Sequence, residues 1–162
     1  MPILNKKDMS EEDIKLNYIT PAIQAKWADQ ITMETKVSIK YKITDGRMSL
    51  KGNMAVRKNP KYADYVLYLN DAKPIAIVEA KDNKHTVSFG LQQAMTYAMM
   101  MDLPFAYSSN GDAFFEHDFL TGKECLISLS DFPSPDDLIA RYYGESKNSD
   151  DIEKAKEELK TS

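Results

Sequence analysis

Two carboxylates and one amine occupy positions from which they could act together on a phosphodiester bond. Asp64 opens the apolar segment 63–69, and Glu79 and Lys81 end the apolar segment 74–81. Residues two apart in a strand point to the same side, so Glu79 and Lys81 share a face. If the two segments pair antiparallel through the short turn between them, Asp64 lies beside both.

These groups have the chemistry of a divalent-metal site. Two neighbouring carboxylates repel each other, and a divalent cation relieves that repulsion. Oxygen ligands suit Mg²⁺ or Mn²⁺, which would lower the pKa of a bound water and polarise a phosphoryl oxygen. Lys81 could place that water or stabilise the charge that develops on the phosphate. Taken alone, the same pattern also fits an ordinary ion pair at the end of a strand.

A polar pair on the next expected helix is predicted to lie over these charges. Gln93 and Tyr97 are four residues apart, and therefore share a helix face with Phe89. A neighbouring stripe of small residues would let the helix approach the sheet closely: Gly90, Ala94 and Ala98. We interpret Gln93 and Tyr97 as groups that orient a ligand or contact the DNA backbone; the alternative is that both face solvent.

Positive charge is concentrated in one stretch, although the whole chain has a net charge of −4. Between positions 36 and 61, eight basic residues face one acid, Asp45, so this stretch carries +7 and the remainder −11. Such a stretch is typical of a surface that contacts phosphates, or alternatively of a solvated strand face. The residues expected to bind double-stranded DNA are Lys36, Lys40, Lys42, Arg57, Lys58 and Lys61.

The elements that must position these groups form an α/β pattern, with a central mixed β-sheet flanked by helices. Helices are expected at 10–28, at 87–101 and from Ser134-Pro135 to Tyr143, and strands at 35–43, 63–69, 74–81, 104–109 and 113–117. Ser10 should cap the first helix, and Pro21 should kink or split it. Residues 44–61 are expected to form a hairpin or loop. We assign 1–144 to one domain and 145–162 to a charged linker or helical tail.

The composition is that of a domain that works in a reducing compartment. The chain has 162 residues, enough for a single sizeable core, and no apolar run of membrane-spanning length. Its start has no secretory signal. The single cysteine, Cys125, excludes an internal disulfide and a zinc or iron–sulfur site built from clustered cysteines. We therefore expect a cytoplasmic protein with no membrane partner, in which His85 and His117 are surface or loop residues.

The order of these motifs resembles the N-terminal nuclease region of type I restriction enzyme R subunits, which are PD-(D/E)xK nucleases. The resemblance covers roughly residues 10–135, and the combined pattern is more specific than any single motif. One departure is Ala63, where the first motif of the family has proline. The segments that carry the resemblance are ITPAI at 19–23 with Trp27, ADYVLY at 63–68, IVEAK at 77–81, QAMTYA at 93–98 and LPFAYSSNG at 103–111, followed by Asp118 and Thr121-Gly122.

The resemblance implies a PD-(D/E)xK restriction-endonuclease-like core and a Mg²⁺-dependent endodeoxyribonuclease, with Mn²⁺ as an alternative ion. It implies that Asp64, Glu79 and the backbone carbonyl of Ala80 are metal ligands. It also implies that Lys81 is the catalytic lysine and that Gln93 and Tyr97 form the accessory motif.

The resemblance further implies a supporting acid on the first helix. Glu11 and Glu12 both qualify, and Glu12 is favoured. Glu34, which precedes the basic strand, is another candidate.

The resemblance also implies partners. R subunits carry an ATP-driven DNA translocase beyond the nuclease region, but this chain has no G-x-x-x-x-G-K-[ST] loop, so no ATP site is expected in it. The implied partners are the translocase region of the same native subunit and the modification and specificity subunits of the complex. Two alternatives stay open, a stand-alone nuclease of the same fold in repair or phage defence and a non-catalytic DNA-binding or assembly module.

Overall fold

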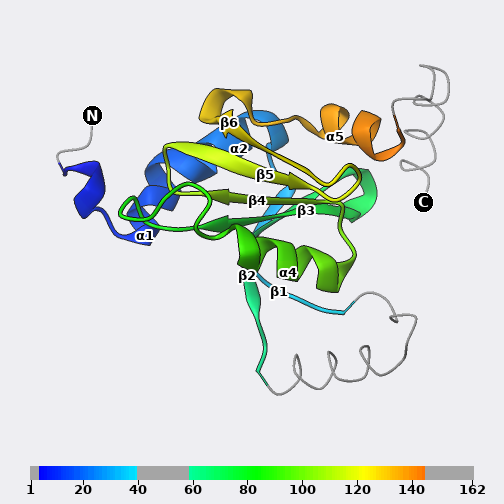
Figure 1. Ribbon diagram of the computed structural model, residues 1–162, viewed down its shortest axis with the longest axis horizontal. Coiled ribbons are helices and arrows are strands. Elements are labelled where there is room, and N and C mark those ends of the chain that lie inside the picture. Colours follow the sequence, from blue (N-terminus) through cyan, green and yellow to red (C-terminus); the bar gives the residue numbers. More distant parts are fainter. Residues whose placement is uncertain (1–3, 40–58, 145–162) are drawn as a thin grey trace.

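A six-stranded mixed sheet with the strand order β1-β2-β3-β4-β5-β6 organises the molecule (Figure 1). The computed structural model describes residues 4–39 and 59–144. Neighbouring strands pair antiparallel except β3 and β4, which are parallel. The predicted α/β class with a mixed central sheet is therefore confirmed. The strands are β1 (Ile31–Lys36), β2 (Tyr62–Tyr68), β3 (Pro74–Ala80), β4 (Phe105–Ser109), β5 (Ala113–Asp118) and β6 (Lys123–Ser128).

The first helix covers the predicted range but changes its winding in the middle. Ser10 caps it through a reciprocal capping box with Asp13. The helix consists of α1 (Glu11–Ile14), a π-helical turn (Lys15–Ile19) and α2 (Thr20–Trp27). Pro21 lies in the first turn of α2, where its missing N–H costs little. The helix is continuous from Glu11 to Trp27, so it is not split at Pro21; its irregular segment is the π-helical turn that precedes this proline.

Helices cover both faces of the sheet, and alternate residues of β3 face the two resulting cores. Ala76, Val78 and Ala80 pack with Ile23 and Trp27 of α2 on one face, which α5 (Pro135–Tyr142) also covers. Ile77 packs on the other face against α4 (Leu91–Met101). Figure 1 shows α2 and α4 on opposite sides of the sheet. In the described part of the chain, no helix has the length and apolar character needed to cross a membrane.

The small-residue stripe brings α4 close to the sheet, as predicted. Ala94 and Ala98 are fully buried. A Cβ atom on Gly90 would come within 3.0 Å of Ser108 Oγ and 3.4 Å of Lys81 Cε. The close approach therefore places the start of α4 directly over the end of β3.

Three sequence-based boundaries need correction. The helix expected from residue 87 begins at Leu91, because residues 82–90 form hydrogen-bonded turns. The strand expected at 35–43 lies earlier, at Ile31–Lys36, because it is set by pairing with β2 from Leu67 to Tyr62; residues 40–43 lie outside the described residues. Strand β6 was not expected at all, because it is an exposed edge strand without an apolar face. The strands around the Asn110-Gly111 turn and the helix capped by Ser134 are confirmed.

A buried ionic network fixes α5 to the sheet. The Arg141 guanidinium donates to both oxygens of Glu116, at 2.8 and 2.9 Å, and to Asp118 Oδ2 at 2.8 Å. The Tyr107 hydroxyl donates to Glu116 Oε2 at 2.7 Å. Because each buried acid has a hydrogen-bonded cationic partner, the network is a structural anchor.

Gly111→Ala should destabilise the fold more than Gly122→Ala. Both glycines have positive φ, 91° and 77°, but a Cβ on Gly111 would lie 2.8 Å from Ile14 Cγ2, whereas nothing lies within 4 Å at Gly122. We expect losses of unfolding free energy of about 3 kcal/mol and about 1 kcal/mol respectively, measured by urea denaturation. Equal losses would show that contact between the β4–β5 turn and α1 contributes nothing beyond backbone strain.

Candidate active site

The side chains of Asp64 on β2 and Glu79 on β3 each accept a hydrogen bond from the backbone of the other strand. Tyr65 pairs with Val78, so Asp64 and Glu79 occupy the next facing position. The backbone N–H of Asp64 donates to Glu79 Oε2 at 2.8 Å, and the N–H of Ala80 donates to Asp64 Oδ2 at 2.8 Å. These reciprocal bonds bring the two carboxylates together, which is the adjacency that antiparallel pairing predicted.

Burial beside Asp64 changes the ionisation of Glu79. Glu79 is only 3% exposed. Burial, followed by the negative charge of Asp64, raises the pKa of Glu79 from 4.5 to about 8, although the Asp64 N–H, Lys81 and Lys15 act in the opposite direction. Glu79 is therefore largely protonated at neutral pH in this structure, as expected for one of two carboxylates forced together.

Gln93 and Tyr97 of α4 lie over the carboxylates. Gln93 Nε2 donates to Glu79 Oε1 at 3.1 Å and to the Tyr97 hydroxyl oxygen at 2.7 Å. Burial, and then the Glu79 carboxylate, raise the pKa of the Tyr97 hydroxyl. The alternative that both side chains face solvent fails for Tyr97, which is buried; Gln93 is exposed, but its amide belongs to a hydrogen-bonded chain that ends on Glu79.

Lys81 lines an open hollow beside Glu79. Its backbone N–H donates to Ser109 O at 2.9 Å, which fixes its Cα at the end of β3. Its ammonium nitrogen lies 5.8 Å from the centre of the Phe89 ring. Among the described residues, no ion pair joins Lys81 to Glu79, so the strand-end ion pair is not what holds these groups. The hollow measures about 510 Å³ and is lined by Lys61, Lys81, Phe89, Gly90, Gln92, Gln93, Thr96 and Tyr97.

A lysine that sequence reasoning missed completes the cluster. The Lys15 side chain is 3% exposed, and its Nζ lies 3.1 Å from Asp64 Oδ1, 3.1 Å from Glu34 Oε2 and 3.2 Å from Glu12 Oε1. Burial alone would lower the pKa of Lys15, but the charge and hydrogen bonds of these carboxylates outweigh it and raise that pKa above its ordinary value. A signal existed in the sequence, since Lys15 continues the four-residue spacing of the buried side chains Ile19, Ile23 and Trp27.

The acids of the first helix are placed differently from one another. Glu12, the favoured candidate, has a side chain that is 78% exposed and contacts Lys15. Glu11 is 41% exposed, and burial followed by the charge of Asp64 raises its pKa, so it is the first-helix acid that Asp64 influences. Glu34 also contacts Lys15. In the described ranges, no three side chains of Asp, Glu, His or Cys are arranged to hold one cation. Of the expected metal ligands, Asp64 and Glu79 lie together as a carboxylate pair.

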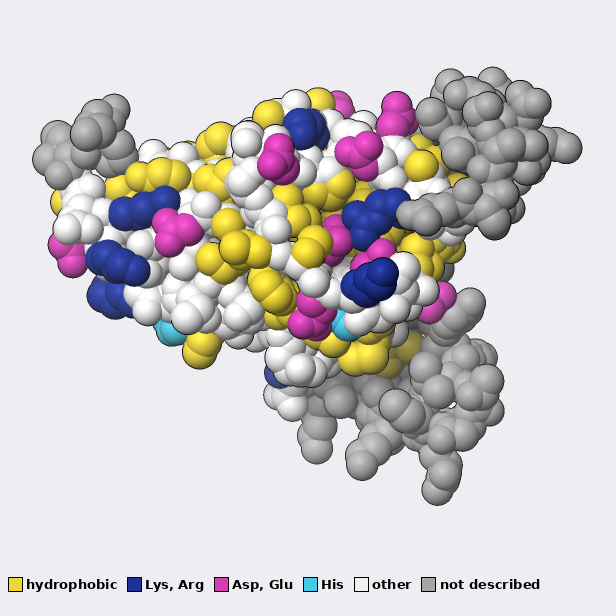
Figure 2. Space-filling view, turned by 45° about the horizontal axis from the view of Figure 1, so that its top comes forward, with side chains coloured by type: hydrophobic (Ala, Val, Ile, Leu, Met, Phe, Trp, Pro, Cys, Tyr) yellow, Lys and Arg dark blue, Asp and Glu magenta, His cyan; other side chains and the backbone are white. Residues whose placement is uncertain are grey.

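The expected DNA-binding residues are only partly described. Lys36 is exposed on β1, and Lys61 is exposed at the border of the hollow, where its carbonyl accepts the Val37 N–H at 2.8 Å. The others lie outside the described residues: Lys40, Lys42, Arg57 and Lys58. On the face shown in Figure 2, basic side chains are interspersed with acidic and apolar ones. A basic stripe is therefore not evident on that face.

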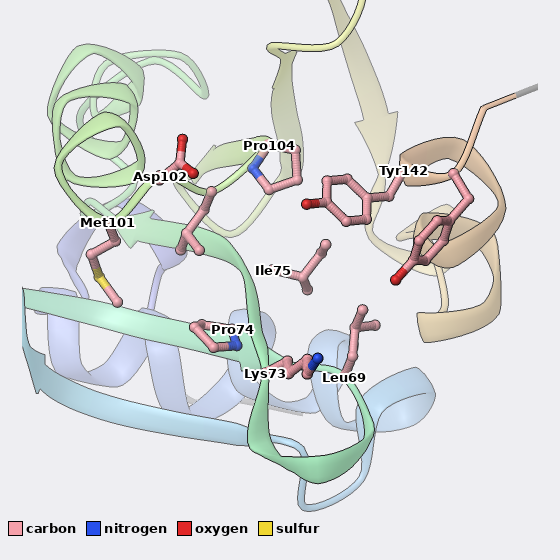
Figure 3. A pocket seen from close by; sticks show the side chains of 10 residues that line it. Leu69, Lys73, Pro74, Ile75, Met101, Asp102, Pro104 and Tyr142 are labelled. Atoms are coloured by element: carbon pink, nitrogen blue, oxygen red, sulfur yellow. The ribbon is translucent and has the colours of Figure 1, made fainter. Parts of the chain in front are cut away.

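A second cavity lies at the opposite end of β3. It measures about 290 Å³, and Figure 3 shows that residues from the start of β3, the end of α4 and α5 surround it. Pro74 and Ile75 belong to it, whereas Glu79 is near the other end of the same strand. The cavity is thus separate from the carboxylate pair.

The two histidines and the cysteine lie outside the site. His85 is a loop residue that contacts Asp82 at 3.1 Å, as expected. His117 is half-buried within β5 and contacts Glu124 at 2.7 Å. Cys125 is exposed on β6, the edge strand.

Three comparisons relate the chain to known proteins. The family described as "Type I restriction enzyme R protein N terminus (HSDR_N)" matches residues 27–133. A type I restriction enzyme EcoAI endonuclease subunit from Escherichia coli is 38% identical over 147 residues, which are 88% of this chain and 18% of that protein. A solved fragment assigned to an HsdR subunit of a type I restriction enzyme from Vibrio vulnificus YJ016 has 34% identity and a TM-score of 0.66, covering 83% of this chain and 25% of the other.

The match spans most of this chain but only a small part of these relatives. The family match includes β1 to β6, with Asp64, Glu79, Lys81, Gln93 and Tyr97. The chain spans about a fifth of the E. coli relative. It belongs to the type I restriction enzyme R protein family, whose N-terminal region it represents.

Proposed function

We propose that this region is a metal-dependent PD-(D/E)xK endonuclease that hydrolyses phosphodiester bonds in double-stranded DNA. The observation that carries the proposal is the pair of reciprocal bonds that holds Asp64 and Glu79 together beside Lys81. One oxygen of each carboxylate is bound by the neighbouring strand. The other oxygen is met by a side-chain donor, Lys15 for Asp64 and Gln93 for Glu79. Side chains can move aside for a ligand, which backbone donors in a sheet cannot.

The donor set fits Mg²⁺ or Mn²⁺. Both ions prefer hard oxygen ligands, and Mg²⁺ is commonly held by one or two carboxylates, with water and substrate phosphate completing its shell. Asp64, Glu79 and the backbone carbonyl of Ala80 would hold the ion, and Glu11 is better placed than Glu12 to support them. A bound ion supplies positive charge to the phosphate and lowers the pKa of a coordinated water.

The remaining residues of the cluster position the substrate. Lys81 carries its charge into the hollow, where it would bind a non-bridging phosphate oxygen and stabilise the charge that develops there. Gln93 fixes the Glu79 carboxylate and is itself fixed by Tyr97, so the pair limits the rotamers of Glu79. Lys61, on the border of the same hollow, would contact an adjacent phosphate.

The relatives support an assignment to a larger complex. The E. coli relative is an endonuclease subunit of a type I restriction enzyme. By this homology, the chain would act with modification and specificity subunits, and a translocase region of the same subunit would use ATP. A purely structural module is a weaker candidate, because burial of Glu79 next to Asp64 opposes folding and would bring no benefit without chemistry.

Divalent cations should stabilise the folded chain. Because the carboxylates repel each other, Mn²⁺ or Mg²⁺ should bind the native state and raise its Tm. At a free metal concentration ten times the Kd, the free energy of unfolding should increase by about 1.4 kcal/mol. Asp64→Asn should remove this shift while it keeps an acceptor for the Ala80 N–H. Lys81→Ala should keep the shift and lose cleavage. An identical Tm with and without millimolar Mn²⁺ in the wild-type chain would contradict the metal site.

Glu79→Gln should abolish cleavage and stabilise the fold at alkaline pH. Folding raises the pKa of Glu79 from 4.5 to about 8, so the wild-type fold loses stability as pH rises through that window, and the loss is complete above it. Glutamine does not ionise. Its advantage should therefore be near zero at pH 4 and on the order of 2–4 kcal/mol at pH 9, in urea melts with EDTA. A variant that is less stable than wild type at every pH would show that the Glu79 carboxylate stabilises the fold.

Lys61→Glu should weaken DNA binding without regard to sequence. Lys61 lines the hollow, so its reversal should lower the affinity for unrelated duplexes equally and reduce the slope of log K against log salt by about 1. Lys73→Glu, which makes the same change beside the remote cavity, is the matched control. Fluorescence anisotropy in Ca²⁺ would measure both. Equal losses for the two variants would indicate a general charge effect.

A further inference from the structure

Lys15 occupies an unusual position for a cationic side chain. It is buried in the π-helical turn of the first helix, where a neutral side chain could be buried at lower cost. A buried charge persists only with strong partners, and three carboxylates lie within 3.2 Å of its ammonium nitrogen. π-Helical turns often mark functional sites, because the extra residue redirects a side chain. Lys15 is thus built into the site.

Glu34, which contacts Lys15, has a strained backbone conformation. It lies at the position opposite Asp64, between the pairs Met33–Tyr65 and Thr35–Ala63. Its φ is +50°, in the left-handed region that non-glycine residues seldom adopt. Such strain persists only where the surroundings over-determine the conformation. The contact between Glu34 and Lys15 at 3.1 Å is one of those determinants.

The carboxylate oxygens of Asp64 divide between two kinds of donor. Oδ2 accepts the N–H of Ala80, which is fixed in the sheet. Oδ1 accepts from the Lys15 ammonium at 3.1 Å. Oδ1 is therefore the oxygen of Asp64 whose donor is a side chain, and a divalent cation that binds there meets the Lys15 ammonium. Two cations then compete for one carboxylate oxygen.

We propose that Lys15 is a positioning residue that acts as the internal counter-ion of the carboxylate site and competes with the divalent cation for Asp64. The inference rests on the proposed function, because it takes Asp64 as a metal ligand. While Lys15 holds Asp64, the carboxylate keeps one orientation and its charge is neutralised. When a divalent cation takes over Oδ1, Lys15 stays paired with Glu34 and Glu12. These two acids therefore let Lys15 release Asp64 without becoming an unpaired buried charge.

A counter-ion and a merely structural lysine predict opposite changes in the affinity for Mn²⁺ when Lys15 is replaced. Lys15→Gln removes the charge and keeps a donor for Asp64. The site then carries one more net negative charge, so its Kd for Mn²⁺ should fall by about tenfold. A lysine that only anchored the first helix would give the opposite result, because its loss would loosen the site and weaken the binding of Mn²⁺.

The experiment is calorimetric titration of the full chain with Mn²⁺ at physiological salt, without DNA. Lys15→Arg keeps the charge and should leave the Kd within about threefold of wild type. Lys73→Gln removes one positive charge at the other end of β3 and should leave the Kd unchanged, because salt screens charges at that separation. If Lys15→Gln is too unstable to titrate at 25 °C, Lys15→Met at low temperature gives the same comparison, with the same expected tightening.

Glu34→Gln tests the second half of the proposal. In the wild-type background it removes the negative charge that pairs with the displaced Lys15 ammonium, and it should therefore weaken Mn²⁺ binding. In the Lys15→Gln background that role no longer exists, so the effect of Glu34→Gln should shrink to a minor electrostatic one. A double-mutant cycle of the four Kd values measures this coupling.

The outcomes separate the inference from the function on which it rests. A folded Lys15→Gln variant with a Kd for Mn²⁺ equal to or weaker than that of wild type, while wild type binds Mn²⁺ saturably, would overturn the counter-ion role alone. A Glu34→Gln effect of equal size in both backgrounds would overturn the role of Glu34 as the acceptor for Lys15. Wild type that shows no saturable Mn²⁺ binding would overturn the metal site itself and this inference with it.

Discussion

The site depends on one constraint, the pairing of β2 with β3 that makes each backbone hold the other strand's carboxylate. Asp64 and Glu79 cannot separate without breaking bonds to the sheet. Their proximity is therefore a permanent feature of the fold, and burial, followed by the charge of Asp64, raises the pKa of Glu79. The surrounding elements supply what this pair requires, namely positive charge, hydrogen-bond donors and space for a ligand.

Those requirements are met from both sides of the sheet. The first helix packs on one face and contributes Lys15 to Asp64, whereas α4 packs on the other face and contributes Gln93 to Glu79. Each helix reaches the site because of a local departure from regular structure. The first helix contains a π-helical turn, and α4 is preceded by its N-cap Gly90, where a Cβ would lie only 3.0 Å from Ser108 Oγ. The Arg141 guanidinium anchors α5 to the sheet through its contacts with Glu116 and Asp118.

Much of this could be predicted because it depends on short-range periodicity. The alternation of β2 and β3 and the short connection between them are sufficient to bring Asp64 beside Glu79. The i, i+4 spacing places Gln93 with Tyr97, and the small residues 90, 94 and 98 predict the close approach of α4. The same local rules predicted the Ser10 cap and the helix that starts at Ser134-Pro135. They could not predict β1 and β6 correctly, because edge strands are defined by their partners and carry little pattern of their own.

The sequence by itself determined the carboxylate pair, the Gln93–Tyr97 pair of α4 and the resemblance to type I R subunits, because each lies within one strand pair, one helix or a set of contiguous motifs. Only the tertiary structure decided that Lys15 contacts Asp64, that burial and the charge of Asp64 raise the pKa of Glu11, and that Lys81 lines the hollow with Lys61 and Phe89. Those facts depend on the winding of a π-helical turn and on contacts between residues 49 positions apart, such as Lys15 and Asp64. The burial of a charge is a property of everything that packs around it, and no local pattern encodes it.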